Sequence, residues 1–142
     1  MESKYAELAE TVAQEAHKGQ KRWNGEPYIT HPKALSEQFC HDSVKAVAWL
    51  HDVLEDNKQW TAERLYEYGF PRKIVDAVVA LTRLEHQTYA QYLQQVAENV
   101  IAVRVKIEDL RHNLSDLQQP QRKDKYEVAL LYLHLYLEGI GR

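Results

Sequence analysis

Cysteine is nearly absent from this sequence, which removes one way of stabilising a small protein. Cys40 is the only cysteine among 142 residues, so no disulfide bond can form within the chain. A chain of this length can bury roughly 68–70% of its unfolded surface, enough for a hydrophobic core. We therefore expect one globular domain over residues 1–142 that is stable without disulfides. The unpaired thiol also fits a reducing compartment such as the cytoplasm.

A long hydrophobic run and a large net charge are missing as well. No run of about 18 apolar residues is present, and the first residues, Met1 to Lys4, are polar, so we expect neither a membrane span nor a signal peptide. The formal net charge of −3 argues against a protein that coats nucleic acid, because such proteins carry a basic excess. These absences predict a cytoplasmic protein with no membrane or nucleic-acid partner. A small phosphorylated substrate remains compatible, because a local basic cluster is enough to bind it.

The apolar residues that are present repeat at the spacing of helices. Tyr5, Leu8 and Val12, for example, share one face of a helix. No segment alternates strictly between polar and apolar residues with turn signals on both sides, so strands are not required. We predict an all-α fold of roughly seven helices in a single domain. The segments expected to be helical are about 2–18, 32–40, 44–56, 61–69, 71–81, 88–96, 100–117 and 123–138.

Local signals predict where several of these helices begin. Asp42 or Ser43 is expected to cap the helix that follows it, because a short polar side chain accepts hydrogen bonds from the first free backbone amides. Thr88 and Gln91 form a capping-box pattern. We interpret the dipeptide His41-Asp42 as a helix start, and any further role for it stays open.

The segment from Trp49 to Asp56 carries the strongest chemical signal. If it is helical throughout, His51 and Glu55 lie on one face, and Asp52 and Asp56 lie on the adjoining face. Burying ionisable groups without partners is costly, and a metal ion would offset that cost. A His-Asp pair alone is weak evidence, because the pair at positions 41 and 42 has a simple structural interpretation.

Two other segments supply residues that complete a ligand set. His31 precedes Pro32 at the end of a loop, and Asp109 lies in a long predicted helix. Two imidazoles and two carboxylates suit Mn²⁺, Fe²⁺ or Zn²⁺ with positions open for water and substrate. We therefore expect one divalent ion, with Mn²⁺ first and Fe²⁺, Zn²⁺, Ni²⁺ or Mg²⁺ as alternatives.

Three blocks of sequence together resemble a known family. They are residues 16–22 (AHKGQKR) with 25–32 (GEPYITHP), residues 50–56 (LHDVLED), and residues 105–109 (VKIED) through 112–114 (HNL). They resemble HD-domain phosphohydrolases, above all the hydrolase domain of Rel/Spo-type alarmone enzymes and the stand-alone small alarmone hydrolases. The similarity covers about residues 5–117. It implies an HD-type helical fold whose metal ligands are His31, His51, Asp52 and Asp109.

The resemblance also implies roles for other residues. Glu55 and Asp56 correspond to the pair that positions and activates the attacking water. Arg22 corresponds to a residue that frames the nucleotide base, and Lys18 and Lys21 can contact phosphate from the same basic loop. Further substrate contacts are implied for three residues of the second half of the chain: Lys106, Asn113 and Tyr126. For these basic and polar residues, a solvated surface position is the alternative.

One departure from the family pattern affects the substrate assignment. The alarmone enzymes usually have Asp-Arg-Leu-His-Asn, whereas this chain has Asp109-Leu110-Arg111-His112-Asn113. The resemblance predicts removal of pyrophosphate from the 3′ position of a guanosine alarmone such as ppGpp. The alternatives are a phosphohydrolase for another nucleotide or phosphoester, and an inactive metal-containing nucleotide-binding module. The final helix is apolar nearly all round, so we expect it to be buried or to form a homodimer interface.

Overall fold

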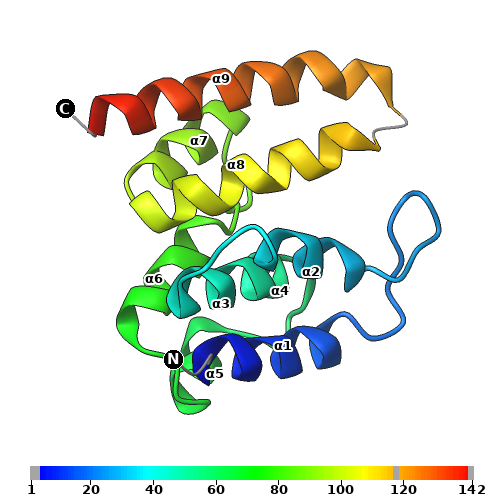
Figure 1. Cartoon of the computed structure of the whole chain (residues 1–142), viewed down its shortest axis with the longest axis vertical. Coiled ribbons are helices and arrows are strands. Elements are labelled where there is room, and N and C mark those ends of the chain that lie inside the picture. The colour runs from blue at the N-terminus through cyan, green and yellow to red at the C-terminus, as the bar shows by residue number, and fades with distance from the viewer. Residues whose placement is uncertain (1–3, 117–118, 141–142) are drawn as a thin grey trace.

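A computed structural model describes residues 4–116 and 119–140, and in these ranges the chain is all-α, as predicted (Figure 1). The described residues form nine α-helices and one 3-10 helix, more than the roughly seven expected, and contain no strand beyond an isolated bridge between Lys21 and Pro27. The helices are α1 (Lys4–Ala16), α2 (Thr30–Ser36), α3 (Asp42–Leu50), α4 (Val53–Asp56), α5 (Ala62–Glu67), α6 (Arg72–Ala80), α7 (Tyr89–Ala97), α8 (Val100–Ser115), η1 (Pro120–Arg122) and α9 (Lys123–Ile140).

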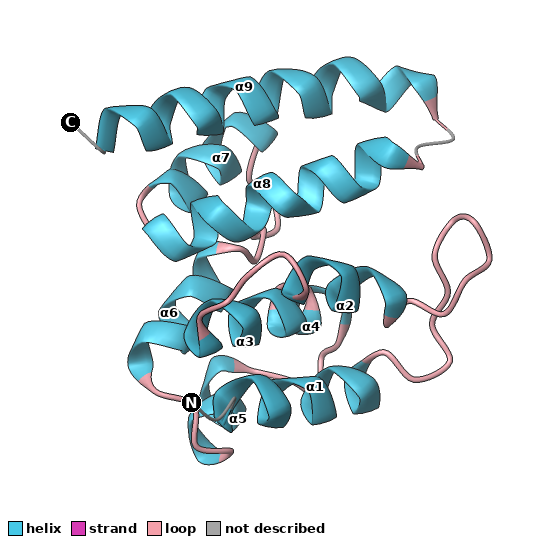
Figure 2. Ribbon diagram, in the orientation of Figure 1, coloured by secondary structure: helices cyan, strands magenta, loops and turns pink. Residues whose placement is uncertain are grey.

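The helices lie in two groups, and α8 of the second group packs against helices of the first. Figure 2 shows α1 to α6 on one side and α7, α8 and α9 stacked on the other. Helix α3 packs against α1 and α2, while α8 contacts α2, α3 and α6 as well as α7 and α9. One hydrophobic core runs through both groups, and Leu35, Leu50, Ile74, Leu110 and Leu133 are buried in it. This packing places the middle of α8 opposite the start of α2 and the end of α3.

The predicted continuous helix through residues 44–56 is wrong. Helix α3 ends at Leu50, and α4 begins at Val53, so His51 and Asp52 lie in the turn between two helices. The backbone of Asp52 (φ −109°, ψ 0°) departs from helical geometry there. The side chain of Asp52 is held by the Tyr28 hydroxyl, which donates to Oδ2 from a distant loop. A tertiary contact therefore competes with the helix that the local pattern favours.

The prediction that Asp42 or Ser43 caps its own helix is also wrong. His41 occupies the N-cap of α3, and its side chain makes no capping hydrogen bond. The carboxylate of Asp42 instead accepts hydrogen bonds from the backbone amides of Tyr5 (3.0 Å) and Ala6 (2.9 Å) in the first turn of α1. A negative charge at this end of α1 satisfies free amides and complements the helix dipole. His41-Asp42 thus begins one helix and caps another.

The capping box at the start of α7 is confirmed. The amide of Gln91 donates to Thr88 Oγ1 at 3.1 Å, and the Gln91 side chain accepts from the Thr88 amide at 2.9 Å. Such a signal is reliable because all of its partners lie within one turn of helix.

Helix α9 is partly buried and partly exposed. Ala129 and Leu133 pack into the core, whereas Val128, Leu131 and Leu135 are exposed on the outer face. The helix is thus buried along one face only, rather than all round, and the homodimer stays a prediction. No helix in the described part of the chain combines the length and apolar character that crossing a membrane requires.

Candidate active site

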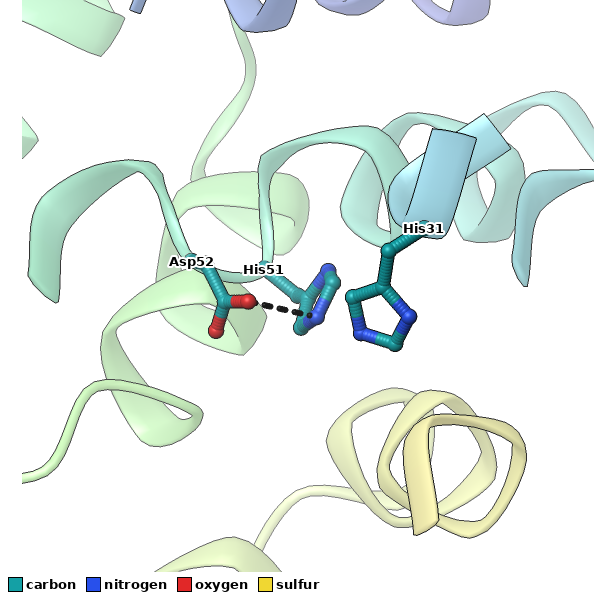
Figure 3. Close-up of side chains that lie close together, drawn as sticks. All are labelled: His31, His51 and Asp52. Atoms are coloured by element: carbon teal, nitrogen blue, oxygen red, sulfur yellow. Dashed lines mark ion pairs between the residues drawn. The ribbon is translucent and has the colours of Figure 1, made fainter. Parts of the chain in front are cut away.

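His31, His51 and Asp52 come together between α2 and the turn after α3. One ligand atom from each lies within 4.8 Å of the others. His51 Nε2 is 3.0 Å from Asp52 Oδ2, and the centroids of the His31 and His51 rings are 5.1 Å apart. Figure 3 shows the two imidazoles side by side, with the Asp52 carboxylate on the other side of His51.

Asp109 joins this group from α8. Its Oδ1 lies 2.8 Å from His31 Nε2 and 3.5 Å from His51 Nε2. Metal–ligand bonds of about 2.0–2.2 Å place neighbouring ligand atoms about 2.8–3.6 Å apart, as in the pairs His51–Asp52, His31–Asp109 and His51–Asp109. The residues whose ligand atoms all lie within 4.8 Å of one another are His31, His51 and Asp52, without Asp109. We call the four residues His31, His51, Asp52 and Asp109 the His–Asp cluster, and a metal ion bound by all four stays a prediction.

The proton positions on His51 also fit a metal ligand. Its Nδ1 lies 2.8 Å from the carbonyl oxygen of Ala48, which can only accept, so Nδ1 carries a proton whether the ring is neutral or charged, and Nε2 is the nitrogen that can exchange its proton for a metal ion. Nε2 is buried and has no hydrogen bond of acceptable geometry to any described residue. Two buried carboxylates that face this nitrogen are stabilised by a positive charge, which either a proton on Nε2 or a bound cation can supply. The donor set of the cluster thus suits Mn²⁺, Fe²⁺ or Zn²⁺.

The electrostatics of the cluster favour positive charge. Burial disfavours protonation of His51, but the carboxylates of Asp52 and Asp109 outweigh it and raise the pKa of His51 well above its ordinary value. Burial also favours neutral carboxyl groups, yet His51 holds the pKa of Asp52 low, and Lys106 with the two histidines does the same for Asp109. Both carboxylates therefore stay ionised and available to a cation at neutral pH.

Neighbouring polar groups hold the cluster in place. His112 Nδ1 is 2.7 Å from His31 Nδ1, and the two rings are stacked. Lys106 Nζ donates to Asp109 Oδ2 at 2.8 Å, and Asn113 Nδ2 donates to Asp109 Oδ1 at 3.1 Å. Partners of this kind orient metal ligands and fix the proton on the non-ligating nitrogen.

A polar hollow of about 350 Å³ adjoins the cluster and shares Asp52 with it. We call it the basic pocket. Its lining contains four basic side chains and two acidic ones, together with three tyrosines: Asp52, Glu55, Arg83, Tyr89, Tyr92, Lys106, Leu110, Asn113, Arg122, Lys125 and Tyr126. An excess of positive charge in a concave site attracts an anion with several charges.

The two predicted catalytic acids lie on α4, next to this pocket. Glu55 is exposed on the pocket wall, and its Oε2 accepts a hydrogen bond from the backbone amide of Arg83 at 3.3 Å. Asp56 is the last residue of α4, and its side chain lies outside the part of the chain that the structure describes. The catalytic roles of both residues stay predictions.

Five of the six predicted substrate-binding residues separate into two groups, and Arg22 lies in neither. Lys106, Asn113 and Tyr126 line the basic pocket. Lys18 and Lys21 are exposed at a different hollow of about 290 Å³ beside the loop between α1 and α2. Their substrate contacts stay predictions, and those of Lys18 and Lys21 would need a ligand that reaches around this loop.

Arg22 is buried and engaged with the end of α8. Its guanidinium donates to Asp116 Oδ2 at 2.5 Å and to Asn113 Oδ1 at 3.0 Å. Burial favours the neutral carboxyl group of Asp116, but the hydrogen bond from Arg22 outweighs it and lowers the pKa of Asp116. Arg22 belongs to the loop of residues 17–29 between α1 and α2, which projects from the helices in Figure 1 and which we call the projecting loop. Because Asn113 also donates a hydrogen bond to Asp109, the contact of Arg22 with Asn113 links this loop to the His–Asp cluster.

Four residues at the site were not among those predicted from the sequence: Tyr28, Arg83, Tyr89 and Lys125. Tyr28 stands inside a family-like block, but only its hydrogen bond to Asp52 reveals what it does. The other three fall outside the blocks, on or near α7 and α9, and reach the pocket only through the packing of α8 against both helices. No local pattern marks them.

Comparison with known proteins agrees with the motifs. No protein-family model matches the chain. It is 31% identical over 139 residues to the guanosine-3′,5′-bis(diphosphate) 3′-pyrophosphohydrolase of Haemophilus influenzae. This alignment covers 88% of this chain and 20% of that protein. It is 29% identical over 140 residues to the bifunctional (p)ppGpp synthase/hydrolase SpoT of Escherichia coli, with the same two shares.

A third relative is the GTP pyrophosphokinase of Streptomyces coelicolor, 30% identical over 142 residues, which cover 92% of this chain and 17% of that protein. The chain therefore spans about a fifth of the length of the curated relatives it matches. Its similarity reaches along nearly the whole chain and confirms the resemblance predicted from the three blocks. Over most of its length, this chain is similar to one part of the Rel/Spo-type (p)ppGpp enzymes.

Proposed function

We propose that this chain is a metal-dependent phosphohydrolase that removes the 3′-diphosphate of ppGpp or pppGpp by attack of water and releases pyrophosphate. The observation that carries the proposal is the junction of two features: the His–Asp cluster and the basic pocket share Asp52. A site for a divalent ion beside a pocket for a multiply charged anion suits phosphate-ester hydrolysis. Two of the relatives carry this hydrolase activity in their names.

The ligands that we assign to the metal are His31, His51, Asp52 and Asp109, and we propose Mn²⁺, with Fe²⁺, Zn²⁺, Ni²⁺ or Mg²⁺ as alternatives. A divalent ion bound there supplies a Lewis acid that lowers the pKa of a water molecule and neutralises charge on phosphoryl oxygens. Lys106 adds a second positive charge beside the proposed metal site, because it lines the basic pocket and its ammonium pairs with Asp109 Oδ2.

Glu55 is our candidate general base. It lies on the pocket wall, one turn after Asp52, where an exposed carboxylate can accept the proton of the attacking water. Asp56 would assist in positioning that water, as the family resemblance implies. The basic side chains of the pocket would hold the phosphate oxygens that are not attacked.

The proposal is tested with purified protein loaded with Mn²⁺ and supplied with ppGpp, by measuring released pyrophosphate and GDP. Equal amounts of both products are expected. Hydrolysis of other nucleotides or phosphoesters, but not of ppGpp, would favour the second candidate, a phosphohydrolase of different specificity. Tight metal binding without turnover of any substrate would favour a nucleotide-binding module. A cytoplasmic location accompanies the proposal as a prediction.

A further inference from the structure

Two tyrosines of α7, one turn apart, line the basic pocket but differ in their hydrogen bonds. The Tyr92 hydroxyl donates to the carbonyl oxygen of Leu81 at 2.7 Å. The Tyr89 hydroxyl is buried and has no hydrogen-bond partner among the described residues. A buried hydroxyl without a partner costs free energy, so an unpaired one in a folded protein calls for an explanation. A ligand that supplies the missing acceptor is one such explanation.

The surroundings of Tyr89 are positively charged. Lys125 Nζ lies 4.1 Å from the centroid of its ring, and Arg83 Cζ lies 5.8 Å from it. Burial and the nearby charges of Arg83 and Arg122 lower the pKa of Lys125. Among the described residues, Lys125 and Arg122 form no ion pair. Like charges gathered in this way favour an anion between them.

The protonation state of Tyr89 also suits an anion. Burial raises the pKa of the Tyr89 hydroxyl above its ordinary value, so the hydroxyl keeps its proton at neutral pH. It can then donate a hydrogen bond to a phosphoryl oxygen, and a bond to a charged acceptor is stronger than one between neutral groups. Lys125 has four rotatable bonds, so its ammonium can move from the ring to a phosphate.

We propose that Tyr89 and Lys125 form an oligophosphate-binding subsite, in which the Tyr89 hydroxyl donates to a non-bridging phosphoryl oxygen and the Lys125 ammonium pairs with the same phosphate group. These residues come from α7 and α9, which supply no ligand to the His–Asp cluster. The inference rests on the proposed function in that the subsite would hold phosphates of the same substrate. The ligand of the subsite is pyrophosphate or the oligophosphate group of a nucleotide.

The test compares Tyr89→Phe with Tyr92→Phe in the metal-loaded full chain, using pyrophosphate as the probe in calorimetric titration. Tyr89→Phe is expected to weaken pyrophosphate binding about tenfold, the effect of losing a hydrogen bond to a charged group. Its melting temperature should equal or exceed that of the unmodified protein. Tyr92→Phe should lower the melting temperature, because it removes a bond to Leu81. Tyr66→Phe, at an exposed tyrosine of α5 that does not line the pocket, should keep the affinity.

Lys125→Ala should weaken pyrophosphate binding by about tenfold, and the loss should shrink at high salt. Lys123→Ala is the matched control, because Lys123 is an exposed lysine on the same helix that does not line the pocket, and it should bind as the unmodified protein does. Unchanged affinity in Tyr89→Phe, or no binding of pyrophosphate by the unmodified protein, would overturn the subsite.

The subsite and the proposed function can fail separately. Pyrophosphate binding that depends on Tyr89, in a protein that does not hydrolyse ppGpp, would leave the subsite standing and reject the proposed function. Hydrolysis of ppGpp with the same KM in Tyr89→Phe and the unmodified protein would support the proposed function and reject the subsite.

Discussion

The His–Asp cluster and the basic pocket adjoin each other but differ in how their charges are balanced. In the cluster, His31 and His51 are each 2% exposed and Asp109 is 5% exposed, and each ionised carboxylate faces a cationic or hydrogen-bonding partner. In the pocket, Lys125 and Arg122 are exposed and, among the described residues, form no ion pair. The cluster is thus preorganised for a small ion, whereas the pocket is complementary to a large anion that supplies the missing negative charge.

The largest expected effect follows from removing an imidazole of the cluster. His51→Ala deletes a nitrogen that faces both carboxylates, so metal content should fall and ppGpp turnover should drop by at least about 1000-fold, equivalent to several kcal/mol of transition-state stabilisation. Elemental analysis and a pyrophosphate-release assay measure the two quantities. Pyrophosphate binding at the pocket should persist, which would separate the two regions.

His41→Ala is the matched control, because it alters the second His-Asp pair of the chain. That histidine is exposed and its side chain makes no capping bond to α3, so metal content and turnover should be unchanged. Equal losses in both variants would contradict the assignment of the metal to the cluster.

A change at the boundary between the two regions should affect the chemical step alone. Glu55→Gln keeps the shape of the side chain but removes the proton acceptor, so kcat should fall about 100- to 10,000-fold while metal content is retained. Glu67→Gln alters an exposed glutamate of α5 and serves as the control. Full activity in Glu55→Gln would reject Glu55 as general base.

A smaller effect on metal binding is expected from changing His112, which contacts a residue of the cluster but does not belong to it. His112 contacts His31 through their two Nδ1 atoms, so His112→Gln should loosen that ligand and weaken metal affinity about 10- to 100-fold. Competition with a chelator measures the affinity directly. His134→Gln is the comparison, because His134 contacts Arg111 and no residue of the cluster. The same affinity in both variants would show that His112 does not support the metal site.

The smallest effect concerns the contact that links the projecting loop to α8. Asp116→Asn removes the ion pair with Arg22 and should lower the free energy of unfolding by about 1 kcal/mol at pH 7. The pKa of Asp116 is lowered in the folded state, mainly through Arg22, which overcomes the opposing effect of burial. The pair therefore stabilises the fold above the unfolded pKa, and this contribution is lost as the pH falls through the lower folded pKa.

Urea denaturation of both proteins at several pH values tests this sign. The difference between them should be constant from about pH 7 to pH 5 and shrink below about pH 4, near the ordinary pKa of aspartate. Asp76→Asn, at an exposed position of α6, should show no such difference. A difference that grows as the pH falls would contradict the proposed linkage.

The features predicted correctly from sequence depend on residues that are close along the chain. Helical spacing predicted the all-α class, and the reciprocal bonds of Thr88 and Gln91 span three residues. The break at His51 and Asp52 was not predictable in this way, because the hydroxyl that holds Asp52 belongs to Tyr28, 24 residues earlier. Asp42 likewise acts on the start of α1, 36 and 37 residues away.

The sequence by itself determined the helical class and supplied the His–Asp residues, because side-chain spacing and short motifs are local and survive in the order of the residues. Only the tertiary structure decided that His31 meets Asp109 across 78 positions and that Arg22 pairs with Asp116 across 94. It also decided that the Tyr89 hydroxyl, beside Lys125, has no hydrogen-bond partner within the described part of the chain. Such contacts follow from how α8 packs against helices on both sides. That packing is a property of the whole core, because each helix can bury its apolar face only against the others.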